Sequence, residues 1–223
     1  MKKSPVIGFY GYWVVLTYLG IIAAGTGMYF AINKNIKYAI VCLILTGICD
    51  MFDGPVARHA KRNDREKSFG IQIDSLADIV NFGMLPAVIG YAVYTNSAEQ
   101  PPGSFGTAVT VIMMSVYVLA ALTRLAYYNV TEAELQSKDE KRRYYEGLPV
   151  TTVAIIIPIA YALCLYFAFP FSAVYNKLLI VIALAFVVRI KVPKLKLRYL
   201  VGFCLLGLPI VVFILRSKGV LLK

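Results

Sequence analysis

Acidic residues are scarce in this sequence, which has 12 Asp and Glu against 23 Lys and Arg among 223 residues. Histidine occurs once, at His59, and the few cysteines lie in apolar runs without the close paired spacing of a zinc site. We therefore expect packed thiols and no zinc centre. An ordinary soluble domain is also excluded, because 59% of the residues are hydrophobic and the mean hydropathy is +0.70.

Long apolar runs predict an all-α integral membrane protein, a polytopic bundle of about seven transmembrane helices, with six to eight as the range. A spanning helix needs roughly 20 mainly apolar residues. Runs of this kind occupy residues 11–31, 36–57, 71–95, 106–129, 149–168, 173–189 and 197–215. The first is long for a signal-peptide core and others follow it, so we expect it to be retained. No intervening segment could form a separate soluble domain, so residues 1–223 are expected to form a single domain.

The net charge of +11 is concentrated between the apolar runs. Sixteen of the 23 cations lie at the N-terminus and in three loops, at residues 58–67, 138–143 and 189–198. By the positive-inside rule these segments are cytosolic, and an odd number of spans places the C-terminus on the other side. Basic loops at this surface attract anionic lipid headgroups, which accounts for the charge without nucleic acid.

Only four acidic residues lie within or at the edges of apolar runs. Asp50 and Asp53 are three apart at the end of the second run, and Asp74 and Asp78 are four apart at the start of the third. Residues at these spacings share a helix face. Two adjacent antiparallel helices would therefore bring four carboxylates together at the cytosolic ends of helices 2 and 3, where unpaired anions would repel one another.

Two interpretations account for this cluster. The carboxylates could be neutralised by Arg58, Arg62 or Arg124 in a purely structural arrangement. Alternatively, divalent cations hold them together, and hard oxygen ligands favour magnesium, manganese or calcium. We favour the cation site, because one or two ion pairs would suffice for a structural role, and a carboxylate at the centre of a spanning helix costs about 2.5–3.5 kcal/mol on insertion scales.

The cluster carries a recognisable spacing. Asp50-Met-Phe-Asp53-Gly54-Pro-Val-Ala57-Arg58, followed by Gly70-Ile-Gln-Ile-Asp74-Ser-Leu-Ala-Asp78, resembles the signature D-x2-D-G-x2-A-R, spacer, G-x3-D-x3-D of the CDP-alcohol phosphatidyltransferases. All eight fixed positions are filled, although the spacer holds eleven residues where about eight are common. The charged residues in it predict a longer cytosolic turn.

Further segments resemble the phosphatidylserine synthase branch of that family. They are Asp74-Ser-Leu-Ala-Asp-Ile-Val-Asn-Phe-Gly83, Arg124-Leu-Ala-Tyr-Tyr-Asn129 and Gly147-Leu-Pro149. Asn81 stands where serine is expected and Tyr127 where arginine is expected. Both departures fall in the region expected to select the alcohol, so the acceptor is less firmly predicted than the reaction type.

The resemblance implies an enzyme that transfers a phosphatidyl group from CDP-diacylglycerol to the hydroxyl of L-serine, giving phosphatidylserine and CMP. It implies two divalent ions held by Asp50, Asp53, Asp74 and Asp78, and Asp78 is also the candidate general base. The CDP-lipid would be bound by Asp50 and Asp53 and by the remaining motif residues, Gly54, Ala57, Arg58 and Gly70.

The serine carboxylate calls for a cation. Arg124 lies within an apolar run and is the candidate for this cation, although an ion pair with a motif aspartate, or snorkelling to the interface, is an equal alternative. The other candidates for the alcohol pocket are Tyr128, Asn129, Arg142 and Arg143.

The remaining expectations concern alternative functions and location. A sister enzyme could use inositol phosphate or glycerol phosphate on the same scaffold. A cation transporter is the non-enzymatic alternative, but transport would distribute acidic residues through the bilayer depth rather than at one face. The resemblance suggests a homodimer, and a bacterial plasma membrane fits the short chain.

Overall fold

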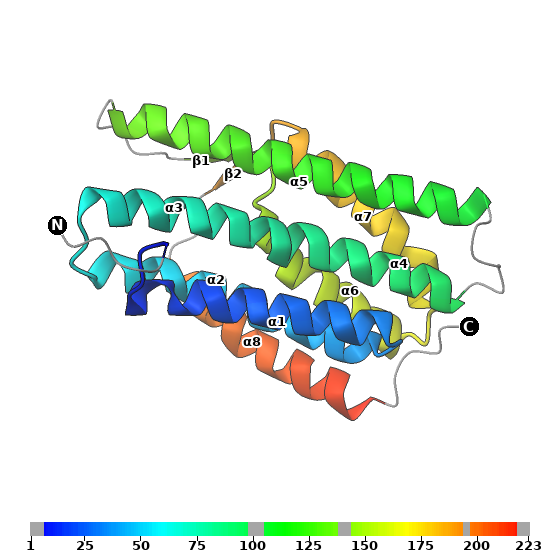
Figure 1. Ribbon diagram of the computed structural model, residues 1–223. Coiled ribbons are helices and arrows are strands. Elements are labelled where there is room, and N and C mark those ends of the chain that lie inside the picture. The colour runs from blue at the N-terminus through cyan, green and yellow to red at the C-terminus, as the bar shows by residue number, and fades with distance from the viewer. Residues whose placement is uncertain (1–6, 98–104, 138–143, 194–196, 218–223) are drawn as a thin grey trace.

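The computed structural model describes residues 7–97, 105–137, 144–193 and 197–217. Its helices run roughly along one direction (Figure 1). A short 3-10 turn, Tyr12–Val14, leads into α1 (Val15–Ile32), and α2 (Ile36–His59) returns beside it. Helices α3 (Asp64–Asp78) and α4 (Leu85–Ser97) are joined without a break by the π-helical segment η2 (Ile79–Met84).

The second half of the chain completes the bundle. Helix α5 (Phe105–Ser137) packs against α7 (Phe171–Val187) and α4, while α6 (Val153–Tyr166) packs against α2 and α8 (Leu197–Arg216). Strands β1 (Tyr144–Glu146) and β2 (Lys191–Pro193) form a small antiparallel pair that the hydropathy pattern did not predict. This pair joins two of the loops predicted to share the cytosolic side.

The predicted class of fold is confirmed. Four helical segments are long and apolar enough to cross a membrane, namely Tyr12–Ile32, Ile36–His59, Asp64–Asn96 and Phe105–Leu135. Two further apolar helices, Val150–Tyr166 and Phe171–Val187, are shorter, and a third apolar segment, Gly207–Arg216, belongs to the 20-residue α8. The seven predicted runs thus correspond to seven apolar helical segments.

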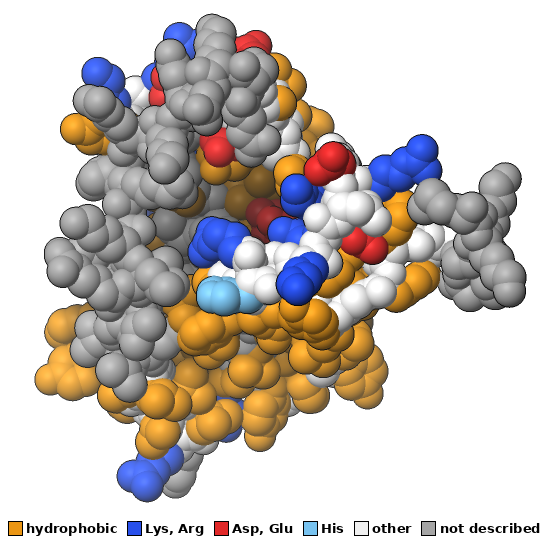
Figure 2. Space-filling model, turned by 90° about the vertical axis from the view of Figure 1, so that its left-hand side faces the viewer, with side chains coloured by type: hydrophobic (Ala, Val, Ile, Leu, Met, Phe, Trp, Pro, Cys, Tyr) orange, Lys and Arg blue, Asp and Glu red, His pale blue; other side chains and the backbone are white. Residues whose placement is uncertain are grey.

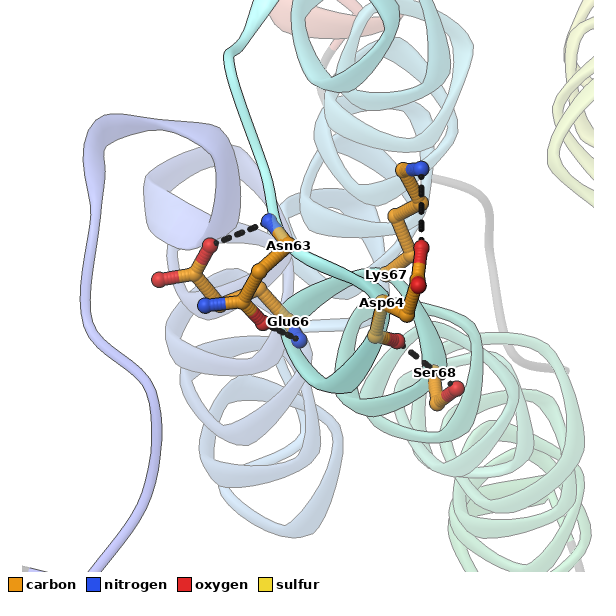
Figure 3. A network of polar contacts seen from close by, with 5 residues as sticks. All are labelled: Asn63, Asp64, Glu66, Lys67 and Ser68. Carbon is orange, nitrogen blue, oxygen red and sulfur yellow. Dashed lines mark hydrogen bonds and ion pairs between the residues drawn. The ribbon is translucent and has the colours of Figure 1, made fainter. Parts of the chain in front are cut away.

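Helix ends support the predicted alternation of the chain. The Nζ atom of Lys37, near the start of α2, donates to the carbonyl oxygens of Leu215 and Ser217, each at 3.4 Å, so α8 ends beside the start of α2. At the opposite end of α2, Asn63 begins α3 with a reciprocal capping box. Its side chain accepts from Glu66 N at 2.9 Å, and Glu66 Oε2 accepts from Asn63 N at 2.8 Å (Figure 3). The two helices bearing the acidic motif therefore meet at a sharply defined turn.

The π-helical segment fixes the path of the third helix. Pro86 has no N–H, so it cannot donate the usual helical hydrogen bond to the carbonyl of Phe82. The hydroxyl of Tyr117 on α5 donates to that oxygen at 2.6 Å, and the hydroxyl of Tyr175 on α7 donates to Pro86 O at 2.9 Å. Both tyrosines are fully buried. Three helices are thus joined by polar contacts inside an otherwise apolar core.

Tyr117→Phe tests this contact. The variant leaves the buried Phe82 carbonyl without its side-chain donor, which we expect to cost about 1–3 kcal/mol. Thermal unfolding in detergent should therefore show a lower midpoint than the parent. Tyr29→Phe removes a hydroxyl from a ring that is 63% exposed and serves as the matched control. Equal midpoints for Tyr117→Phe and Tyr29→Phe would contradict the assigned role.

Candidate active site

The structure brings three of the four motif aspartates into one cluster. Carboxylate oxygens of Asp50, Asp74 and Asp78 all lie within 4.8 Å of one another. Asp53 lies against Asp74 and also accepts a hydrogen bond from the hydroxyl of Thr17 on α1 at 3.3 Å. Asp53 is 7% exposed and Asp78 9% exposed, so these charges are largely removed from water. The i, i+3 and i, i+4 spacings on antiparallel helices are sufficient to explain the convergence.

A cation is the natural complement of this cluster. Three carboxylates at such short range repel strongly in a partly buried site, and removing them from water adds a further cost. Neither Arg58 nor Arg62 forms an ion pair within the described part of the chain, where the ion pairs join Lys67 to Asp64 and Arg189 to Glu146. Oxygen-only ligands suit a hard divalent cation. The residues present therefore fit a divalent metal.

A cavity of about 170 Å³ opens beside the cluster. Its walls come from the 3-10 turn, α1, α2, α3 and the turn between α2 and α3, and its lining residues are Trp13, Val14, Thr17, Asp53, Gly54, Ala57, Arg62, Gly70, Ile71 and Asp74. Figure 2 views this end of the molecule and shows acidic atoms at the bottom of a recess bordered by Lys and Arg side chains. Five of the eight motif residues line the cavity, so the signature defines one concave site.

The two motif glycines have different surroundings. A Cβ atom at Gly54 would meet only Arg58 Nη1, at an ordinary 3.9 Å, so packing within the chain does not demand glycine there. A Cβ atom at Gly70 would lie 2.9 Å from Arg62 Nη1 and 3.2 Å from the Trp13 ring. Gly54 thus leaves open space for a ligand, whereas Gly70 makes room for Arg62 and Trp13.

The predicted cation Arg58 is exposed on the last turn of α2 and does not line the cavity. Arg62, which the sequence interpretation considered only as a structural counter-ion, lines it instead. Trp13 and Thr17 were not predicted either. The sequence gives little signal for them, because both belong to the first helical segment and reach the motif only through tertiary packing.

The predicted alcohol-binding residues fall into two groups. Asn129 on α5 exchanges hydrogen bonds with Ser75 Oγ, at 2.9 and 3.2 Å, and Ser75 follows Asp74 in the chain. Arg124 is 6% exposed and donates to Gly147 O at 3.4 Å. Tyr128 is half-buried on the same helix. Arg142 and Arg143 lie outside the described residues.

Arg124 borders a second cavity of about 180 Å³. Its lining residues are Thr123, Arg124, Tyr127, Glu146, Phe186, Val187, Val188 and Arg189, so the two cavities share no lining residue. The hydroxyl of Tyr127 donates to Glu146 Oε2 at 2.9 Å, and Arg189 lies over the Tyr127 ring. Of the two departures from the branch pattern, Tyr127 therefore lies beside Arg124. Asn81 instead packs against Gly20 of α1.

Comparison with known proteins agrees with this geometry. A model of the CDP-alcohol phosphatidyltransferase family matches residues 14–190. The chain belongs to this family. A CDP-diacylglycerol–serine O-phosphatidyltransferase of Saccharomyces cerevisiae is 42% identical over 53% of this chain and 40% of its own length. A protein of the same name from Mycobacterium leprae is 32% identical over 68% of this chain and 47% of its own length.

A more distant relative extends the comparison to archaea. The archaetidylserine synthase of Methanothermobacter thermautotrophicus is 24% identical over 72% of this chain and 62% of its own length. The chain therefore spans about half the length of the curated relatives it matches. All three names describe enzymes of the serine branch, the branch that the segments around Asn81 and Arg124 resemble.

Metal binding can be tested directly on the aspartates. We expect the purified protein to bind Mn²⁺, and Asp74→Asn to weaken that binding at least about tenfold, because an anionic ligand of a hard cation is replaced by a neutral one. Electron paramagnetic resonance of free Mn²⁺ in titrations with the detergent-solubilised protein measures the affinity. Asp64→Asn is the matched control, since Asp64 lies on the same helix with a fully exposed side chain. Unchanged Mn²⁺ affinity in Asp74→Asn would contradict the assigned site.

Proposed function

We propose that this protein transfers the phosphatidyl group of CDP-diacylglycerol to the hydroxyl of L-serine, releasing CMP. The observation that carries the proposal is the convergence of Asp50, Asp74 and Asp78 beside a cavity that five of the eight signature residues line. The names of the relatives support serine as the acceptor. The acyl chains would lie in the membrane and the cytidine diphosphate in the cavity.

The aspartates would hold the divalent cations, for which we propose two Mg²⁺ or Mn²⁺ ions. Bound there, such ions would offset the charge on the diphosphate and on the departing CMP. Asp53 is oriented by Thr17, so the first helix contributes to the precision of the site. The open space at Gly54 would let the nucleotide approach the backbone of α2.

Asp78 is the proposed general base. It is the most deeply placed aspartate on α3 and is largely shielded from water, where a carboxylate can accept the proton of the attacking hydroxyl. The serine oxygen then forms a bond to the lipid-linked phosphorus as the bond from that phosphorus to the oxygen of CMP breaks. The proton passes to Asp78, and no covalent enzyme intermediate is needed.

Arg124 is the proposed partner of the serine carboxylate. It lies five residues before Asn129, about 7.5 Å along α5, and Asn129 bonds the residue next to Asp74. The Arg124 side chain and the metal cluster therefore lie near the same stretch of α5.

We further propose that the site faces the cytosol of a bacterial plasma membrane and that the protein is a homodimer, as the basic loops and the family resemblance suggest.

An alcohol screen tests the reaction. Membranes containing the protein are incubated with CDP-diacylglycerol and L-serine, glycerol phosphate or inositol phosphate, and the release of CMP is measured. We expect release with serine, and its loss when EDTA removes the divalent ions. Release with a phosphorylated alcohol but not serine would assign the protein to a sister activity, and no release with any alcohol would contradict the proposal.

Arg124→Ala tests the acceptor site separately. A hydrogen bond to a charged group contributes about 1.5–3 kcal/mol, so we expect the KM for serine to rise roughly 10- to 100-fold. The KM for CDP-diacylglycerol should remain near the parental value. Arg65→Ala, which removes an exposed arginine that lines neither cavity, is the control. An unchanged KM for serine in Arg124→Ala would show that another group binds the carboxylate.

A further inference from the structure

Arg62 occupies an unusual position in the cavity beside the aspartates. It belongs to the short turn between α2 and α3, yet its guanidinium carbon lies 5.2 Å from the centroid of the Trp13 ring. The Trp13 ring is 7% exposed and packs edge-on against Phe69, which in turn packs against Phe9. A cation held over an aromatic face is restricted in its motion. The Arg62 side chain is therefore held in one position rather than moving freely in solvent.

The hydrogen bonding of the Arg62 guanidinium is incomplete. Its Nε atom is buried and has no hydrogen-bond partner among the described residues, and no ion pair to Asp53 or Asp74 is formed although all three residues line the same cavity. A buried N–H donor without an acceptor is costly. A counter-ion for the aspartates would be expected to contact one of them. The guanidinium is thus held in the cavity without an acceptor among the described residues.

The cavity consequently has two kinds of charge on its walls. Asp53 and Asp74 contribute the carboxylates that would hold metal, and Arg62 contributes a cation held over the Trp13 ring. Gly70 has no side chain at the point where the guanidinium and the Trp13 ring meet, so even a methyl group would displace them. A ligand that fits both walls must be anionic and must also be able to coordinate a metal. A nucleoside diphosphate has both properties.

We propose that Arg62 directly contacts the diphosphate of the nucleotide-activated lipid, held in place by Trp13. Arginine suits this task because its planar guanidinium remains charged and can present two N–H donors to a phosphate. The inference rests on the proposed function, because it assumes that a CDP-lipid occupies this cavity. It adds a binding residue outside the eight-residue signature and gives the N-terminal turn a role in substrate binding.

The test is CDP binding by the full-length protein in detergent with Mn²⁺ present, measured by isothermal titration calorimetry. Arg62→Met keeps an apolar stem over Trp13 and removes the charge. We expect it to weaken CDP binding about tenfold or more, because hydrogen bonds to charged groups are lost. Arg62→Lys should recover part of the affinity. Arg65→Met is the matched control, since Arg65 is exposed and lines neither cavity.

Further measurements separate a binding role from a structural one. Arg62→Met should leave Mn²⁺ affinity and the thermal midpoint at parental values, and in turnover it should raise the KM for CDP-diacylglycerol but not that for serine. Parental CDP affinity in Arg62→Met would overturn the inference while leaving the proposed function intact. Equal weakening by Arg62→Met and Arg65→Met would overturn it too, as would a loss of CDP binding that only accompanies a lower midpoint. If the parent protein itself binds no CDP, the proposed function fails with it.

Discussion

Repulsion among carboxylates is the constraint on which the structure of this site depends. Asp50, Asp74 and Asp78 are held within 4.8 Å at the ends of two helices, in a chain that is otherwise poor in acidic residues. In a partly buried setting this arrangement opposes folding unless a cation compensates it. The surrounding apolar bundle must therefore supply enough packing free energy to keep the aspartates together. A bound cation would remove the repulsion that remains among them.

The packing around η2 determines where the end of α3 lies relative to the rest of the site. Asp78 is the last residue of α3, immediately before the π-helical segment, so the position of η2 sets the position of the proposed base. Buried tyrosines from α5 and α7 hold this segment through Phe82 and Pro86 carbonyls. The capping box at Asn63 fixes the other end of α3. The acidic helix is thus anchored on both sides of the motif, by polar contacts that apolar packing alone would not specify.

Much of this arrangement could be predicted from the sequence, and the limits have physical causes. Periodicity and hydropathy predict the helices and the convergence of the aspartates, because both follow from local spacing. They do not predict the β1–β2 pair, whose strands are three residues long and lie in basic loops far apart in the chain. They also do not predict that Arg62, rather than Arg58, lines the cavity. Arg62 is placed there by tertiary contact with Trp13, which packs against Phe69.

The same reasoning explains why the reaction type is better determined than the acceptor. The proposed metal and nucleotide half of the site lies on consecutive helices, with a fixed spacing that can be read along the chain. The proposed acceptor half combines Arg124 and Tyr127 of α5 with Glu146 of β1 and Arg189 after α7, so it exists only through tertiary packing. In a site assembled from distant segments, one basic side chain can replace another without any change in the signature residues. Differences in alcohol specificity within such a scaffold are therefore expected to arise around α5 and the β1–β2 pair, while the aspartates stay constant.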